Sequence, residues 1–80
     1  MGIKDAVVKR FKDICESRQI RYNELATLSG ITPSTVYSMM DPSRRDLSII
    51  TIKKLCDGLD ISIYEFFSDP IFYELEQEIK

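Results

Sequence analysis

The sequence predicts a small all-α domain, and three observations predict it. Apolar residues recur at helical spacing along most of the 80-residue chain. Ser, Thr, Pro and Gly residues stand where helices would start and stop, so the stretches between them are separate helices. No stretch makes a credible strand, because the one β-branched run, "LSIIT" (47–51), continues into a helical pattern. We therefore expect a compact bundle of helices joined by short turns.

The first expected helix covers residues 3–18 and has an apolar side and a charged side. The apolar side carries Ile3, Val7, Phe11, Ile14 and Cys15, and the polar side carries Lys4, Lys9, Arg10 and Lys12.

Two short helices follow, at residues 22–29 and 33–41. Gly30 is a natural left-handed stop for the first of them. Thr32 can cap the second, and Pro33 stands at its first position, where a missing N–H costs nothing. The apolar residues of the first of these helices are Leu25, Ala26 and Leu28, and the expected inward residues of the second are Val36, Met39 and Met40.

A turn, "DPSRRD" (41–46), precedes three further expected helices. Ser48 can cap a helix over 49–58, and "SIYE" (62–65) is a capping box that starts a helix through Phe67. Asp69–Pro70 starts a sixth helix over 70–79. Residues 1–68 are expected to form the main domain and 69–80 an added C-terminal helix. The inward side of the fourth helix is expected to carry Ile49, Ile52, Leu55 and Cys56. The apolar residues of the sixth helix are Ile71, Phe72, Leu75 and Ile79.

Composition excludes several function classes. The hydrophobic fraction of 44% is ordinary for one globular domain. No apolar run approaches the roughly 20 residues of a membrane helix, and the N-terminus lacks an export signal, so we expect a cytoplasmic protein. With no His and no Gly-rich phosphate loop, neither an enzyme nor a metal or cofactor site is expected. Cys15 and Cys56 are expected to be reduced core residues.

The charge is divided unevenly along the chain. Residues 1–64 hold ten Lys/Arg and eight Asp/Glu, a net charge of +2, whereas residues 65–80 hold one Lys and five acids, a net charge of −4. The total of −2 argues weakly against nucleic acid, but the division leaves room for a basic face in the first part of the chain.

The stretch "NELATLSGITPSTVYSMM" (23–40) joins two short helices by a turn that contains Gly. Such helices cross steeply, and this geometry commonly serves to place the second helix in the DNA major groove. The close crossing needs a small residue at Ala26, a turn glycine at Gly30 and an aliphatic residue at Val36.

On this spacing, residues 11–67 resemble the helix-turn-helix family of Cro and the lambdoid phage repressors, the XRE family. The following segment, "LSIITIKKLCDGLDISIYEFF" (47–67), is similar to that family's fourth and fifth helices. The resemblance implies a five-helix lambda-repressor-like fold, binding to double-stranded DNA and frequent dimerisation.

Carried over by position, the resemblance implies two sets of DNA contacts. Because the base-facing set has no Arg, Gln or Asn, base discrimination is expected to be modest or assisted by DNA shape. Phosphate contacts are expected from residues that flank the second helix, the recognition helix and the start of the fourth helix. The base-facing residues are Tyr22, Pro33, Ser34, Tyr37 and Ser38; the phosphate-facing residues are Arg21, Thr32, Thr35, Arg44, Arg45 and Ser48.

Two departures from the family stand out. Many members have a buried Arg–Glu pair where this chain has Cys15 and Met40. Replacing both partners of a buried ion pair by apolar residues is often neutral or stabilising, so we expect these two side chains to touch in the core. Arg21 replaces the usual capping residue of the second helix and adds a positive charge near DNA.

The large apolar residues of the expected sixth helix predict a two-fold homodimer seam through Ile71, Phe72, Leu75 and Ile79. Such a dimer would set two recognition helices about 34 Å apart. The alternative is that this helix folds back over its own core.

The leading hypothesis is a DNA-binding transcriptional regulator, most simply a repressor, with the helix at 33–41 in the major groove. Three alternatives stay open. The serines and Tyr37 can form a plain solvated helix face. The fold can serve as a protein-interaction module without DNA binding. The chain can also be an antitoxin that binds a toxin and its operator.

Overall fold

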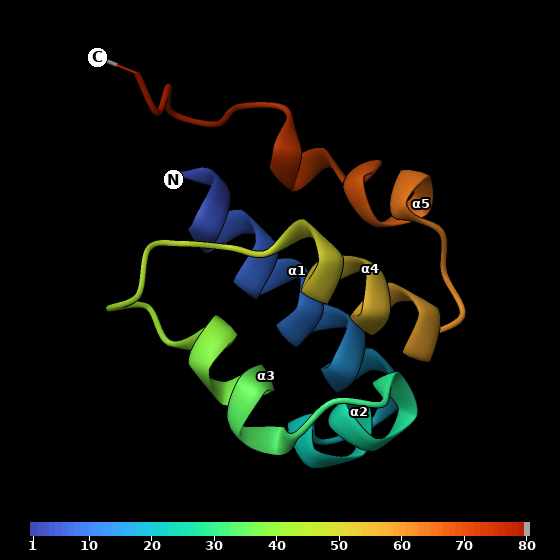
Figure 1. Ribbon diagram of the computed structural model, residues 1–80. Helices are drawn as coiled ribbons and strands as arrows, with labels where there is room; N and C mark the ends of the chain where they lie inside the picture. Colours follow the sequence, from blue (N-terminus) through green and yellow to red (C-terminus); the bar gives the residue numbers. More distant parts are fainter. Residues whose placement is uncertain (80) are drawn as a thin grey trace.

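The computed structural model describes residues 1–79, and every regular element over that range is a helix or helical turn (Figure 1). The all-α prediction is therefore confirmed. The bounds expected for the first, second and fourth helices agree with the structure, and the third ends one residue early. The elements are α1 (Ile3–Arg18), α2 (Tyr22–Ser29), α3 (Pro33–Met40), α4 (Ile49–Gly58), α5 (Ile63–Phe67) and one 3-10 turn, η1 (Pro70–Phe72).

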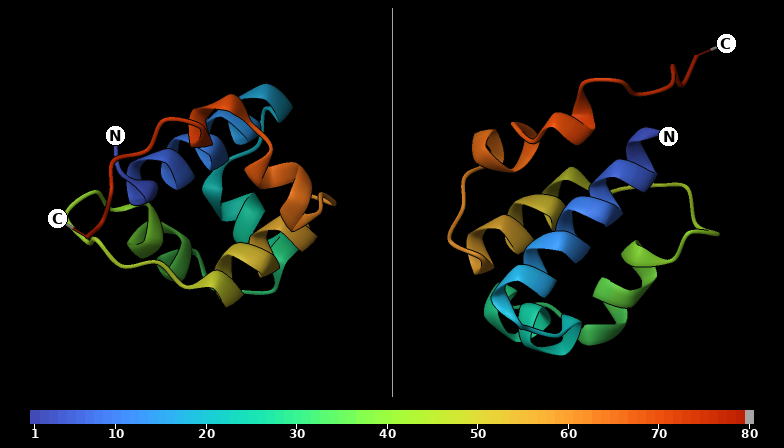
Figure 2. Two further views of the ribbon diagram at one scale, coloured as in Figure 1. Left: turned by 90° about the horizontal axis from the view of Figure 1, so that it is seen from above. Right: turned by 180° about the vertical axis from the view of Figure 1, so that it is seen from behind.

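Helix α1 runs along the back of the molecule in Figure 1 and lies in front when the molecule is seen from behind (Figure 1, Figure 2). Helix α2 packs against both α3 and α4, η1 packs against α1, and α5 packs against α4. Helices α2 and α3 form one end of the molecule, and α5 and η1 form the other. The pair α2–α3 is thus presented at one end of the molecule.

The expected helix starts are confirmed. The hydroxyls of Thr32, Ser48 and Ser62 each accept a hydrogen bond from the amide three residues on, so each satisfies a free N–H of the first turn. Gly30 ends α2 with φ +70°, a conformation that L side chains rarely adopt.

The core is one cluster built around two phenylalanines. The rings of Phe11 on α1 and Phe66 on α5 are fully buried, with centroids 4.4 Å apart. Burying a side chain of this size contributes about 1.5–3 kcal/mol relative to leaving it exposed. Leu25, Val36 and Leu55 are also fully buried, so α2, α3 and α4 all contribute to this cluster.

Two apolar residues are exposed, and one of them, Ile49, was expected to point inward. Ile49 is 62% exposed because it opens α4, and α4 reaches the core only from Ile52 onward. Leu28 is 59% exposed and lines a surface hollow with Asn23 and Thr27, since the inward face of α2 is filled by Leu25 and Ala26. Lys4 differs from expectation in the opposite way, because the sequence places it on the polar face of α1 and the structure buries it.

The prediction of a helix over 70–79 is wrong. Only Pro70–Phe72 forms a helical turn, and Tyr73–Ile79 continues irregularly (Figure 2). Two forces oppose the helix. Carboxylates at Glu74, Glu76 and Glu78 would face the negative end of its dipole. The amide of Glu76 also bonds to the carbonyl of Met1 (3.1 Å), which removes it from any helical ladder.

Both cysteines are free and buried, as expected. Burial raises the pKa of the Cys56 thiol to about 11 and also raises that of Cys15. Cys15 and Met40 belong to the same core cluster, with 3% and 7% of their surfaces exposed. Their direct contact stays a prediction.

Gly58 makes the crossing of α2 and α4 possible. A Cβ at this position would meet Ser29 Oγ well inside van der Waals distance, and Leu28 C and Ser29 N at 3.0 Å. We expect Gly58→Ala to lower the free energy of unfolding by about 1–3 kcal/mol, because overpacking outweighs the better helix propensity of alanine. Urea denaturation measures this.

Ser29→Ala gives the matched comparison, since it removes the hydroxyl that the new Cβ would strike. That hydroxyl is buried and has no hydrogen-bond partner. The double variant should recover part of the loss. Strict additivity of the two single effects would show that the clash with the Ser29 hydroxyl is not the cause.

Candidate nucleic-acid interface

The turn between α2 and α3 is closed by backbone hydrogen bonds. The amide of Gly30 donates to Thr27 O (3.3 Å), and the amide of Ile31 donates to Ala26 O (3.1 Å). This pattern satisfies the carbonyl end of α2 and turns the chain at once into α3. Ala26 and Val36 are fully buried, as the close crossing of the two helices requires.

Helix α3 buries one side and exposes the other. Val36, Met39 and Met40 lie in the core. The exposed side presents Pro33, Ser34, Thr35 and Tyr37, with Ser38 half-buried at its edge. This is the face that carries four of the five residues expected to contact bases.

Hydroxyl groups are interlinked at the start of α3. The Thr32 hydroxyl lies 3.1 Å from that of Ser34 and 2.9 Å from that of Thr35. It also accepts from the Thr35 amide at 3.3 Å. Because hydroxyls rotate and both donate and accept, this group can exchange its internal bonds for phosphate oxygens or base edges.

Tyr22 connects α2 to the exposed face of α3. Its ring meets the Tyr37 ring edge-on, with centroids 5.6 Å apart. Burial raises the pKa of the Tyr22 hydroxyl, and Tyr37 remains 53% exposed. Both rings line a cavity of about 330 Å³ together with Lys12 and Arg21, so two cations adjoin the aromatic pair.

A second, smaller cavity of about 140 Å³ lies between α3 and the start of α4. It is lined by Thr35 and Ser38 from α3 and by Arg44 and Ser48 from the segment that follows. The structure thus brings together four of the expected DNA-contacting residues. The Ser48 hydroxyl accepts from the Thr51 amide at 3.2 Å and so caps α4 at the wall of this cavity.

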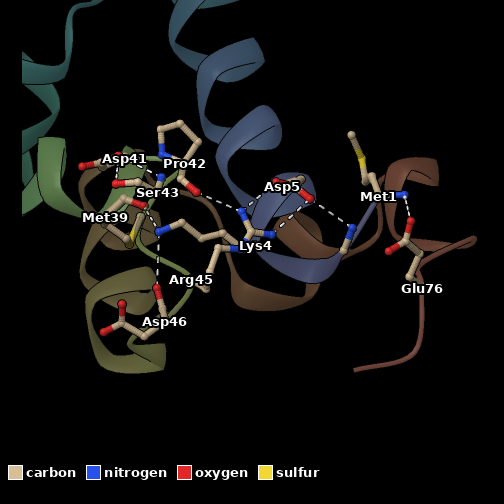
Figure 3. Close-up of polar contacts among 11 residues, drawn as sticks. Met1, Lys4, Asp5, Met39, Asp41, Pro42, Ser43, Arg45, Asp46 and Glu76 are labelled. Carbon is tan, nitrogen blue, oxygen red and sulfur yellow. Dashed lines mark hydrogen bonds and ion pairs between the residues drawn. The ribbon is translucent and has the colours of Figure 1, made fainter. Parts of the chain in front are cut away.

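Arg45 does not join Arg44 in this cavity. Its guanidinium lies 3.2 Å from the Asp5 carboxylate and donates to Pro42 O at 3.0 Å (Figure 3). The Arg45 hydrogen bond lowers the pKa of Asp5, and the Gly2 amide adds to this effect. The Arg44 side chain is 63% exposed, and its ion pair with the Asp41 carboxylate is long, at 3.9 Å.

Three cations of α1 have structural roles that sequence reasoning missed. Arg10 donates to Phe66 O (2.9 Å) and Glu65 O (3.2 Å), and Arg18 donates to Leu59 O (2.5 Å). The Lys4 ammonium donates to Met39 O and, at 3.3 Å, to Asp46 O. One sequence signal could have found Lys4: it falls at helical spacing in line with Val7, Phe11 and Ile14.

Comparison with known proteins agrees with this geometry. Residues 10–70 match the Cro/C1-type HTH DNA-binding domain. The crystal structure of the prophage Lp1 protein 11 is also similar, with 30% sequence identity and a TM-score of 0.80. That alignment covers 94% of this chain and 100% of the other. No curated protein matches.

The chain belongs to the Cro/C1-type helix-turn-helix family of DNA-binding domains. The resemblance to the XRE family is therefore confirmed, and so is the lambda-repressor-like fold, with the correction that the segment after α5 is not a sixth α-helix. Over residues 1–79, no helix is long and apolar enough to cross a membrane, and no cluster of metal-ligating side chains occurs.

The Asp5–Arg45 pair predicts a change in acid titration. Arg45→Ala should return the pKa of Asp5 upward toward its ordinary value of 3.8, whereas Arg44→Ala should leave it low. Because the folded pKa is depressed, the stabilisation is present above pH about 3.8 and is lost as the pH falls through the folded value. Carboxyl NMR titration of both variants measures this. Equal pKa values for Asp5 in the two variants would contradict the pairing.

Proposed function

We propose that the protein is a sequence-specific DNA-binding transcriptional regulator, most simply a repressor that occludes a promoter, with α3 lying in the major groove. The observation that carries this proposal is the exposed face of α3, flanked by two cavities that adjoin Arg21 on one side and Arg44 on the other. Family membership supports DNA binding by this face.

Base reading would rest on short and aromatic side chains. Ser34 and Ser38 can donate to or accept from several bases, and Pro33 offers only an apolar contact, such as one to a thymine methyl. Tyr22 and Tyr37 would pack at sugar or base edges as a pair. With no long amide or guanidinium on this face, sequence-dependent DNA shape would supply part of the specificity.

Phosphate contacts would come from both flanks of α3. Arg21 adjoins the aromatic pair, while Thr35, Arg44 and Ser48 surround the smaller cavity, and Thr32 lies at the start of α3. Arg45 would contact phosphate only by leaving Asp5. Within residues 1–79, Lys12 and Arg21 form no ion pair and remain available to DNA.

A homodimer would bring two copies of α3 to successive turns of DNA. Phe72 is removed from the dimer seam expected from the sequence. Its ring lies 4.9 Å from Phe67 and 5.8 Å from Phe66 within the same chain. For Phe72, therefore, the alternative holds that this segment folds back over its own core. The seam we propose rests on Ile71, Leu75 and Ile79, with Ile79 87% exposed, and the segment 69–80 would act as the dimerisation extension of the domain formed by residues 1–68.

DNA selection followed by sequencing tests the function. The protein should enrich a palindrome with half-sites about one turn apart, and affinity should fall steeply with salt. Arg44→Ala should weaken binding to all sequences alike and reduce the salt slope by about 1, whereas Ser34→Ala should change the selected motif. Lys9→Ala serves as the same-charge control, because Lys9 pairs with Asp13 on α1 at 3.1 Å.

A negative selection would favour the second candidate, a protein-interaction module or antitoxin-type partner binder. One observation already favours it: Arg10, Arg18 and Arg45 are held within the molecule and are not free for phosphate. Absence of both enrichment and salt-sensitive binding would replace the regulator by this candidate.

Oligomeric state is tested separately. Ile79→Asp should shift the protein from dimer to monomer in sedimentation at micromolar concentration, because it places a charge in an apolar seam. Tyr64→Asp, at a residue 84% exposed and outside the seam, is the matched control. A monomeric wild-type protein, or equal effects of the two variants, would refute the seam.

A further inference from the structure

Lys4 is a lysine buried at the first turn of α1. Its residue surface is 2% exposed, and it is the one charged residue in the core of the described part of the chain. The ammonium donates to the main-chain carbonyls of Met39 and, at 3.3 Å, Asp46 (Figure 3). A buried ammonium is costly to desolvate, so it persists only where such acceptors compensate for the lost water.

The two carbonyls belong to different ends of one loop. Met39 lies in the last turn of α3, and Asp46 lies just before Ser48, which caps α4. One ammonium therefore closes the loop at both ends. The carbonyl end of α3 also carries the negative pole of the helix dipole, which favours a cation at this position.

A second tie starts from the neighbouring residue of α1. The Asp5 carboxylate holds Arg45, and Arg45 in turn donates to Pro42 O at 3.0 Å. Within the loop, the Asp41 carboxylate accepts from both the amide (2.9 Å) and the hydroxyl (2.8 Å) of Ser43. The backbone of the loop is thus tied at several points by the first turn of α1 and by its own side chains.

We propose that Lys4 is a positioning residue for DNA recognition: it sets the spacing between the base-reading helix α3 and the phosphate-facing start of α4. The inference rests on the proposed function. Arg44 and Ser48, which line the cavity beside α3, are carried on the segment that Lys4 holds. An interface that is ordered before binding loses less conformational entropy on association, so the clamp would raise affinity for a matched site.

The test compares two substitutions that remove the same charge. Lys4→Met keeps an unbranched apolar chain in the core, and Lys9→Met removes an exposed lysine that pairs with Asp13. Affinity for a selected duplex and for a random duplex is measured at low temperature, where circular dichroism shows each variant fully folded. Both variants should lose random-duplex affinity alike, since each loses one positive charge.

Lys4→Met should in addition lower the ratio of specific to non-specific affinity by about tenfold, the equivalent of losing one base contact, while Lys9→Met should change it less than about twofold. A role in stability alone would lower the melting temperature and leave this ratio unchanged. An equal ratio for the two folded variants would overturn the proposal.

A measurement on the wild-type chain keeps the proposal testable if Lys4→Met does not fold. Backbone order parameters for residues 41–47 in the free protein should lie near the rigid value of about 0.85. Values below about 0.6, rising only when DNA is added, would show that DNA and not Lys4 orders the loop, which would also overturn the proposal. Failure of the wild-type protein to bind any duplex refutes the proposed function instead, and the order parameters then still report whether the loop is held.

Discussion

Three cations of α1 satisfy the carbonyl ends of three other helices, and the arrangement of the molecule depends on this. Lys4 bonds at the end of α3, Arg18 at the end of α4 and Arg10 at the end of α5. A helix leaves its last four carbonyls without intrahelical partners, and the dipole makes that end negative. Because the donors share one helix, α1 fixes where the others end relative to one another.

Arg10 shows how the polar and apolar parts support each other. It donates to two carbonyls at the end of α5, lies 3.5 Å from the Asp69 carboxylate, and places its guanidinium 5.7 Å from the centre of the Phe66 ring. Phe66 packs on Phe11, one residue beyond Arg10 on α1. One segment of α1 therefore binds both the backbone and the side chain of α5. Phe67 and Phe72 extend this aromatic group, which holds η1 against the body of the protein.

Because three cations of α1 bond to helix ends, fewer positive charges are available to bind DNA. Cations that hold helix ends cannot at the same time neutralise phosphate, so the division between structural and free cations matters more than net charge. Cys15 and Met40 replace the common buried ion pair, and both are buried. The buried positive charge of this chain instead stands at the first turn of α1, where backbone carbonyls accept from it. Charge-assisted hydrogen bonds of this kind are about twice as strong as neutral ones.

Local chemistry by itself determined the helices and their order. Caps such as Thr32 and Ser48, the stop at Gly30 and the helical spacing of apolar residues act within one turn of the chain, so the sequence contains their causes. The exposed face of α3 could be predicted for the same reason, because Val36, Met39 and Met40 define its inward side.

Tertiary structure decided the rest. The pairing of Arg45 with Asp5 joins residues 40 positions apart, and the end of α3 bonds to Lys4 across 35 positions. Phe72, Leu75 and Ile79 have helical spacing, yet Glu76 bonds to the N-terminus across 75 positions and Phe72 packs into the aromatic core. Helical periodicity carries no information on such partners, since it depends only on neighbours along the chain.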